Sequence, residues 1–293
     1  MKKNELIGGL GESEELRLVP ISRPQEEEKG LVLAKSGGKI RLRRIDPNAT
    51  GTASKRKAEK QIDKLRVRLT ELQQALYAEH QRSLLIVIQA MDTGGKDGAI
   101  KNICSGLDPN GVQLTNFKVP SSEEWDHDFL WRVHKAAPGK GIIGIWNRSH
   151  YEDVLVPRVH RQISRTVWRD RCEHINAFER LLNCNGVTFL KFFLHISKEE
   201  QKARLEARLK DPQKLWKFHP GDLKERARWD VYQRIYEAVM NETATDFAPW
   251  HIVPANRKWS RNLVLLETVV AKLEEMNPRY PKLAFDANAI VIE

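Results

Sequence analysis

The sequence contains few cysteines, and no pattern joins them. Cys104, Cys172 and Cys184 are the three cysteines in 293 residues, and they lie far apart without a CxxC spacing or clustered histidines. A disulfide framework needs paired cysteines, and a structural zinc site needs closely spaced cysteine and histidine ligands. Neither is therefore expected, and the cysteine usage fits the reducing cytoplasm.

Long apolar stretches are also missing. A membrane-spanning helix needs roughly 18 consecutive apolar residues, and no run approaches that length. The first residues lead into Glu5 and the Gly8-Gly9 pair instead of the apolar core of a secretory signal. We therefore expect a cytoplasmic protein with no membrane partner.

Acidic residues are in the minority. Lysine and arginine number 49 against 39 aspartates and glutamates, which gives a formal net charge of +10 and a pI of about 9.5. Such an excess attracts anionic partners through long-range electrostatics. Nucleic acids, anionic lipids and polyanionic small substrates all meet this requirement, so charge alone does not choose among them.

Short apolar segments alternate with helical stretches along most of the chain. The expected strands are residues 84–89, 112–119, 141–146, 187–196 and 250–254. This rhythm is typical of a mainly parallel sheet covered on both faces, so we predict a three-layer α/β/α domain with about five strands. The domain is placed at residues 51–293, after a partly ordered N-terminal arm at residues 1–50. Its first helix has an apolar face from Ile62 to Leu76 that packs against the sheet or a partner subunit.

The most informative motif, AMDTGGKDG at residues 90–98, follows the first predicted strand and precedes a predicted helix. Backbone N–H groups of such a turn, the positive end of the next helix and a lysine together bind phosphate. We predict a phosphate-binding loop in which Gly94, Gly95, Gly98 and Lys96 contact a phosphoryl group. For this degenerate loop alone, the alternative is a strand-to-helix turn without a ligand.

The loop departs from the usual pattern GxxxxGK[ST] in two places. Ala90 replaces the first glycine, and Asp97 replaces the hydroxyl residue that contacts magnesium, which argues against an ordinary ATPase. Asp92 and Asp97 also flank Lys96, and carboxylates beside a phosphate site repel the substrate unless a divalent cation lies between them. The sequence therefore predicts a bound metal ion.

A second set of charged residues follows the third predicted strand. The planar guanidinium of Arg148 is suited to holding phosphoryl oxygens, and Glu152 and Asp153 follow it closely. Ligands of open α/β sheets bind beyond the carboxyl ends of the strands, so an acidic residue here can share a metal with Asp92. For Arg148 alone, the alternative is a surface ion pair with Glu152.

A basic segment at residues 198–234 carries interleaved aromatic residues. Proline and glycine interrupt it, as in a helical lid, which we place at about residues 204–228. A lid over a phosphoryl-transfer site excludes water and supplies positive charge. Basic and aromatic residues together also bind single-stranded nucleic acid, which is the main rival interpretation.

These segments together resemble the polyphosphate kinase 2 family. The resemblance is carried by the loop at 90–98, WNRSHYEDVL at 146–155, WRVH at 131–134, LKFFLHIS at 190–197, WKF at 216–218 and APW at 248–250. It extends from about Ser54 to the C-terminus. Asn147, where other subgroups carry aspartate, and the Glu152-Asp153 pair are similar to class III, whose members phosphorylate nucleoside mono- and diphosphates.

The resemblance implies a P-loop kinase-like fold and transfer of the terminal phosphoryl group of inorganic polyphosphate to AMP or ADP, with GMP and GDP as alternative acceptors. It also implies Mg²⁺, with Mn²⁺ as a substitute, and a homodimer or homotetramer. The expected catalytic residues are Asp92, Lys96, Arg148 and Asp153. The expected metal ligands are Asp92, Asp153 and Glu152. Further phosphate contacts are expected from Arg132, Arg204, Arg208 and Lys217.

Two other classes fit part of the sequence. An ATP-dependent small-molecule P-loop kinase would share the loop, but it would usually keep the Ser or Thr that Asp97 replaces. A nucleic-acid-binding P-loop protein would explain the net charge but not the carboxylates around Lys96. We therefore expect no nucleic-acid partner.

Overall fold

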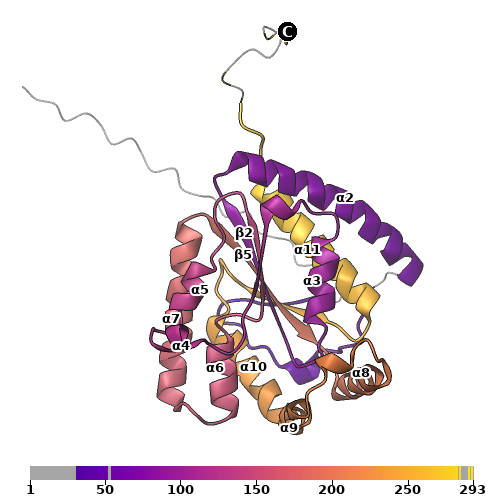
Figure 1. Cartoon of the computed structure of the whole chain (residues 1–293), viewed down its shortest axis with the longest axis vertical. Coiled ribbons are helices and arrows are strands. Elements are labelled where there is room, and N and C mark those ends of the chain that lie inside the picture. Colours follow the sequence, from indigo (N-terminus) through magenta and orange to yellow (C-terminus); the bar gives the residue numbers. More distant parts are fainter. Residues whose placement is uncertain (1–30, 52–53, 283, 285–289, 291, 293) are drawn as a thin grey trace, which may run out of the picture.

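A six-stranded sheet with helices on both faces forms the centre of the molecule (Figure 1). The computed structural model describes residues 31–51, 54–282, 284, 290 and 292. The strands are β1 Val32–Ala34, β2 Ser83–Ala90, β3 Val112–Asn116, β4 Ile143–Asn147, β5 Val187–His195 and β6 Trp250–Pro254. Their order is β1-β6-β5-β2-β4-β3, and only the β1–β6 pair is antiparallel among the described residues. The predicted three-layer, mainly parallel α/β/α architecture is confirmed, with each of the predicted strands present.

The segment before residue 51 contributes to the sheet. β1 pairs with the edge strand β6, with Val32 opposite Ile252. Farther along, the backbone N–H of Ile40 donates to Asn241 Oδ1 at 2.8 Å. The structure thus makes residues 31–50 part of the domain, which we expected to begin at residue 51. Sequence periodicity did not reveal this pairing, because it is formed by backbone groups of the two edge strands. Residues 1–30 of the predicted arm lie outside the described residues.

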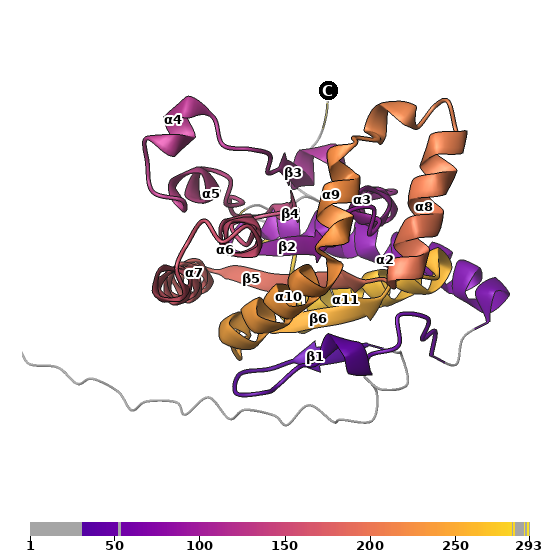
Figure 2. The ribbon, with the colours of Figure 1, turned by 90° about the horizontal axis from the view of Figure 1, so that it is seen from below.

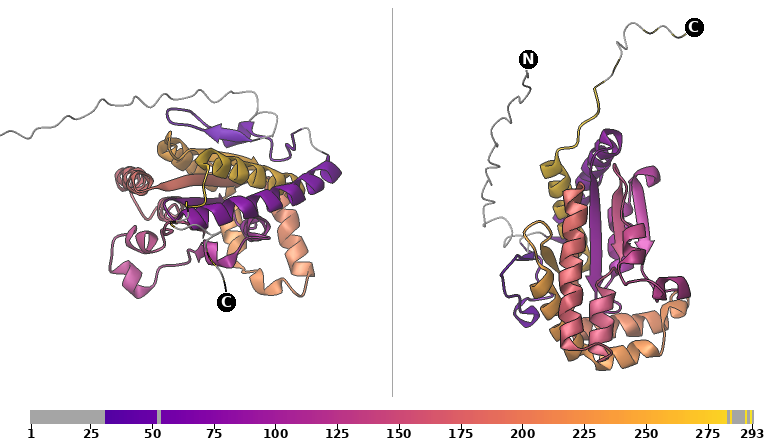
Figure 3. Two further views of the ribbon diagram at one scale, coloured as in Figure 1. Left: turned by 90° about the horizontal axis from the view of Figure 1, so that it is seen from above. Right: turned by 90° about the vertical axis from the view of Figure 1, so that its left-hand side faces the viewer.

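One face of the sheet is covered by α2 Lys55–Glu79, α3 Lys96–Cys104 and α11 Lys258–Met276, and the other by α6 Glu152–Val159, α7 Arg165–Cys184 and α10 Trp229–Thr243. Figure 3 shows α2 and α11 side by side. Ile62, Leu69, Leu72 and Leu76 of α2 are buried within the single chain. The apolar face that we considered for a subunit contact is therefore already covered by the chain's own core.

Two connections carry short helices. The connection after β3 contains α4 Ser122–Trp125 and α5 Trp131–Lys135, and the lid after β5 contains α8 Lys198–Lys210, η3 Leu215–Lys217 and α9 Gly221–Ala227. Figure 2 shows them apart, with α4 and α5 on the side of α6 and α7, and α8 in the lid on the other side. Two further 3-10 turns are η1 Leu42–Arg44 and η2 Pro109–Gly111. Ser197 caps the N-terminus of α8, where its Oγ accepts a hydrogen bond from Glu200 N at 3.1 Å. Within the described part of the chain, no helix is long and apolar enough to cross a membrane.

A buried ion pair connects the sheet to the helical layer. Lys191 Nζ in β5 donates to Glu179 Oε2 at 2.7 Å, to Tyr151 Oη at 2.9 Å and to the Thr243 carbonyl at 2.8 Å. Tyr151 Oη in turn donates to Glu179 Oε1 at 2.6 Å. Burying these charges is tolerated because their polar atoms are hydrogen-bonded. Since Tyr151 follows Arg148 by three residues, the network also anchors the segment that carries this arginine.

A buried histidine makes stability depend on pH. His251 in β6 lies with Nδ1 3.3 Å from the Lys191 carbonyl, and burial lowers its pKa from 6.5 to about 4. Between pH 6.5 and 4 the unfolded chain binds a proton that the folded chain does not. The free energy of unfolding should therefore fall as the pH drops through this window, by up to about 3 kcal/mol. Urea unfolding at a series of pH values measures the change.

The matched variants for this measurement are His251→Leu and His219→Gln, the second at an exposed histidine. His251→Leu should lose stability less steeply than the unmodified chain over this pH range. His219→Gln should follow the unmodified chain. Equal slopes in all three proteins would contradict the assignment to His251.

Candidate active site

The loop between β2 and α3 is shaped by its glycines. Thr93 and Gly95 adopt positive φ angles of 58° and 96°. A Cβ added at Gly94 would lie 2.5 Å from Ala90 Cβ and 2.7 Å from the Met91 carbonyl oxygen, so no side chain fits there. The turn therefore needs these glycines to curl its backbone at the N-terminus of α3, a position where backbone N–H groups and the helix dipole favour an anion.

Lys96 begins α3 and turns back over the loop. Its Nζ donates to the carbonyl oxygens of Ala90 at 3.0 Å and Met91 at 3.4 Å. Burial lowers the pKa of Lys96, the nearby positive charge of Arg148 lowers it further, and the Asp92 carboxylate opposes both effects. An anion beside this ammonium would favour its charged form.

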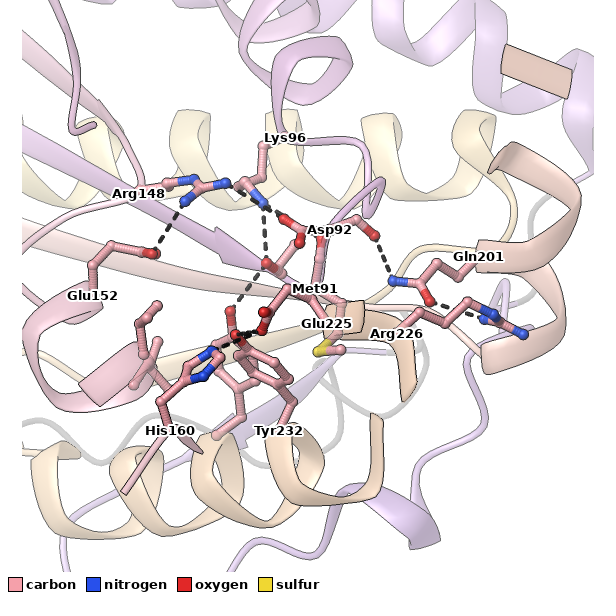
Figure 4. A pocket seen from close by; sticks show the side chains of 14 residues that line it. Met91, Asp92, Lys96, Arg148, Glu152, His160, Gln201, Glu225, Arg226 and Tyr232 are labelled. Atoms are coloured by element: carbon pink, nitrogen blue, oxygen red, sulfur yellow. Dashed lines mark hydrogen bonds and ion pairs between the residues drawn. The ribbon is translucent and has the colours of Figure 1, made fainter. Parts of the chain in front are cut away.

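Arg148 lies between two carboxylates, as Figure 4 shows. Its Nη2 is 3.4 Å from Asp92 Oδ1, and its Nη1 is 3.3 Å from Glu152 Oε2. Glu152 raises the pKa of Arg148, while burial raises the pKa of the Glu152 carboxyl. The i,i+4 ion pair that we considered for Arg148 is therefore present, and its contact with Asp92 also turns the guanidinium toward the loop.

The predicted pairing of Asp92 with Asp153 is not found. Asp153 Oδ2 is 3.4 Å from Arg132 Nη2 and lines a different cavity, whereas Glu152 lines the pocket with Asp92 and Lys96. Neighbouring residues of an α-helix point about 100° apart, so only one of the two acids at the start of α6 can face the loop. The structure places Glu152 there.

Two predicted phosphate-binding arginines are already engaged with other partners. Arg132 is buried and contacts Glu124, Asp153 and the Lys118 carbonyl. Arg204 donates to the carbonyl oxygens of Thr93 at 3.2 Å and Ala255 at 2.6 Å and pairs with Glu200. Their guanidinium donors are used within the protein, and neither residue lines the pockets around Lys96, so the structure does not place them on the path of a polyanion.

The lid brings the other two predicted residues to the loop. Lys217 Nζ is 2.9 Å from Asp97 Oδ2, and this contact lowers the pKa of Asp97. Asn147 also donates to Asp97, from Nδ2 to Oδ1 at 3.2 Å. Arg208 donates to the Lys217 carbonyl at 3.0 Å. Asp97 therefore joins α3 to the lid through its contact with Lys217.

Several residues that were not predicted from the sequence donate hydrogen bonds to carbonyl oxygens of the loop. Arg261 in α11 is buried, and its Nη1 donates to the Gly95 carbonyl at 3.1 Å. Burial lowers the pKa of Arg261 to about 10, with Arg204 contributing. Gln201 donates to the Asp92 carbonyl at 2.9 Å, and Tyr236 to the Ala90 carbonyl at 3.0 Å. No local pattern singles out these residues, because they come from distant helices.

Two chambers meet at Asp92, Lys96 and Arg148. The inner chamber, about 200 Å³, extends toward Glu152, Tyr232 and other residues of α6, α9 and α10. The outer chamber, about 540 Å³, is lined by the loop and by five basic side chains: Lys96, Lys118, Arg148, Arg208 and Lys217. The shared residues thus lie where a phosphoryl group could pass between two ligands.

Comparison with known proteins adds independent information. A family model described as polyphosphate kinase 2 matches residues 52–281. An AMP/ADP-polyphosphate phosphotransferase from Meiothermus ruber is 48% identical over 258 residues, covering 87% of this chain and 97% of the relative. An ADP-polyphosphate phosphotransferase from Rhodopseudomonas palustris is 41% identical over 227 residues, covering 73% of this chain and 78% of the relative. The crystal structure of polyphosphate kinase 2 from Arthrobacter aurescens TC1 superposes with a TM-score of 0.84 at 42% identity, covering 88% of this chain and 96% of that chain.

The crowding at Gly94 predicts a local defect in Gly94→Ala. The added methyl must displace Ala90 or the Met91 carbonyl, so the free energy of unfolding should fall by about 1–3 kcal/mol. Affinity for inorganic triphosphate should fall by at least about tenfold, because the loop amides move out of position. Gly139→Ala is the control, since no atom lies within 4 Å of its added Cβ. Urea unfolding and calorimetric titration measure both quantities, and equal behaviour of the two variants would contradict the prediction.

Proposed function

The chain belongs to the polyphosphate kinase 2 family, and on this basis we propose that it transfers the terminal phosphoryl group of inorganic polyphosphate to AMP or ADP, with GMP and GDP as further acceptors. The observation that carries the proposal is the junction of two chambers at Asp92, Lys96 and Arg148. A phosphotransferase must bring two anionic reactants together at one point, and this junction places two cations there.

The basic outer chamber suits the polyphosphate chain. Lys96 and the loop amides hold the phosphoryl group being moved, while Arg148 binds its oxygens from the opposite side. The attacking atom is a phosphate oxygen of the acceptor, which is already mostly ionised. It therefore needs placement and charge neutralisation more than a strong base.

The residues present also fit a magnesium ion. Among the described residues, no group of three or more His, Cys, Asp or Glu side chains is arranged to hold a metal. Magnesium at nucleotide sites needs only one or two carboxylates, because phosphates and water supply its other ligands. We propose that Asp92 and Glu152 hold Mg²⁺, or Mn²⁺ in its place. The bound ion would neutralise charge on the two reactants.

For location and assembly we propose a cytoplasmic homodimer or homotetramer. The free state of Cys104, Cys172 and Cys184 supports a reducing compartment. The subunit contact must use a surface other than the buried apolar face of α2, which packs within the chain.

The activity is tested by mixing the protein with Mg²⁺, ADP and polyphosphate and measuring ATP. Lys96→Ala should lower kcat by at least about 100-fold, because the transferred group loses its nearest cation. Lys101→Ala, at an exposed lysine of the same helix, should stay within about twofold. ATP formation without polyphosphate, or equal rates in both variants, would contradict the proposal. Phosphorylation of a small molecule by ATP alone would instead favour an ATP-dependent kinase.

The metal assignment is tested with the neighbouring acids of α6. Glu152→Gln should raise the Mg²⁺ concentration for half-maximal activity by about tenfold or more, because one oxygen ligand is lost. Asp153→Asn should change it by less than about threefold, because that side chain faces Arg132. If Asp153→Asn raised this Mg²⁺ concentration more than Glu152→Gln, the assignment would be contradicted. The metal would then be assigned to the pair predicted from the sequence, Asp92 and Asp153.

A further inference from the structure

A polar side chain lies within the central strand that leads into the phosphate loop. Gln89, near the end of β2, is fully buried, and positions 84–88 before it are all apolar and buried. Burying a carboxamide is costly unless its N–H and carbonyl groups find hydrogen-bond partners. An apolar residue would avoid this cost, so the partners of Gln89 indicate what the residue does.

The carboxamide of Gln89 bridges two residues that follow β4. In the orientation that satisfies both of its ends, Nε2 donates to Glu152 Oε1 at 3.1 Å, and Oε1 accepts from the backbone N–H and the hydroxyl of Ser149, each at 3.2 Å. The reverse orientation would point the carboxamide oxygen at the Glu152 carboxylate, which can only accept. Ser149 Oγ also accepts from Tyr151 N at 3.2 Å, so its own hydrogen can be donated to Gln89.

The backbone is strained at Arg148, the residue before Ser149. Its φ angle is 62°, in the left-handed region that side chains other than glycine rarely adopt. The N–H of Arg148 donates to the Ile88 carbonyl at 3.2 Å, which continues the parallel pairing of β4 with β2. The chain then leaves the sheet, and the next N–H, that of Ser149, bonds to the Gln89 side chain instead. Backbone strain of this kind persists only where surrounding contacts hold it.

The second contact of Gln89 reaches the guanidinium of Arg148 through Glu152. One oxygen of this carboxylate, Oε1, accepts from Gln89, and the other, Oε2, is 3.3 Å from Arg148 Nη1. Burial raises the pKa of the Glu152 carboxyl, whereas Arg148 and the hydrogen bond from Gln89 oppose the rise. Gln89 thus favours the charged carboxylate that Arg148 needs as a partner. It acts on Arg148 twice, once through the backbone of Ser149 and once through Glu152.

We propose that Gln89 is a positioning residue that holds Arg148 where the two chambers meet, an inference that rests on the phosphate-binding role proposed for Arg148. Gln89 lines neither chamber, so it acts through its neighbours and not by touching a ligand there. An arginine that is already ordered beside the loop loses less conformational entropy when a phosphoryl group binds. The buried carboxamide therefore prepares the site for its anionic ligand.

The first test replaces Gln89 by methionine, which has a similar length but no strong donor or acceptor. In calorimetric titration without added metal, Gln89→Met should lower the affinity for inorganic triphosphate by about fivefold or more, because Arg148 is no longer held beside the loop. Omitting the metal separates Arg148 from any effect on Mg²⁺. An unchanged affinity in folded Gln89→Met would overturn the proposal.

Gln73→Met is the matched control. Gln73 in α2 is also buried, and its carboxamide also makes two hydrogen bonds, from Nε2 to the Asp108 carbonyl at 2.8 Å and from Asp108 N to Oε1 at 3.0 Å. It lines neither chamber. Gln73→Met should therefore lose stability in urea unfolding but keep its triphosphate affinity within about twofold. Equal losses of affinity in the two variants would mean that any buried carboxamide matters, and would overturn the proposal.

A double-mutant cycle asks whether Gln89 acts through Arg148. Arg148→Ala should itself weaken triphosphate binding. In that background, Gln89→Met should change the remaining affinity by less than about twofold, because the residue that Gln89 positions is gone. Losses that simply add would mean that Gln89 acts on another part of the loop, and would overturn the proposal.

Catalytic constants separate this inference from the proposed activity. Gln89→Met should lower kcat by about tenfold or more, since a displaced arginine no longer meets the charge of the transferred group. The KM for polyphosphate should rise by less than about threefold, because Lys118, Arg208 and Lys217 of the outer chamber still hold the chain. An unchanged kcat would overturn the proposal. If the unmodified protein made no ATP but Gln89→Met still weakened triphosphate binding, the proposed activity would be lost and the positioning role would stand.

A second variant covers the case in which Gln89→Met does not fold, as judged by circular dichroism. Ser149→Ala removes the hydroxyl that bonds to Gln89 and leaves the Gln89–Glu152 contact in place. It should weaken triphosphate binding by about threefold or more, and this loss should disappear in the Arg148→Ala background. Full triphosphate affinity in folded Ser149→Ala would overturn the proposal.

Discussion

The active site depends on one balance of charge: the guanidinium of Arg148 lies between the carboxylates of Asp92 and Glu152, next to the ammonium of Lys96. Each group alone would be costly to bury, and together they compensate one another. In the proposed reaction, phosphate oxygens and Mg²⁺ would replace these internal partners. The same four groups would then stabilise the unliganded protein and also bind the two anionic reactants.

The surrounding structure keeps this arrangement in place without occupying its centre. Four side chains donate to carbonyl oxygens of the phosphate loop and so fix the path of its backbone: Arg204, Arg261, Gln201 and Tyr236. On the neighbouring segment, the buried Lys191 network anchors Tyr151 shortly after Arg148. The outer chamber keeps an excess of positive charge, because its five basic side chains face the three carboxylates of Asp92, Asp97 and Asp222.

Much of the fold and the centre of the site could be predicted from local sequence. Buried parallel strands appear as short apolar runs, and a phosphate loop needs glycines and a lysine in consecutive positions, so β2, Gly94 and Lys96 were identifiable. Arg148 followed because the residue after a strand lies at the carboxyl edge of the sheet. The edge strand β1 was not predicted, since three residues carry too little periodicity to distinguish a strand from an arm.

The sequence by itself determined which chemical groups are available and which strand end each one follows, because these properties depend on neighbours along the chain. Only the tertiary structure decided which groups meet. Rotation along α6 directed Glu152 to Asp92 and Asp153 to Arg132, and packing against the loop engaged Arg204 and brought Arg261 to Gly95. Side-chain direction and distant pairing are set by how helices pack onto the sheet, which no spacing in the sequence records.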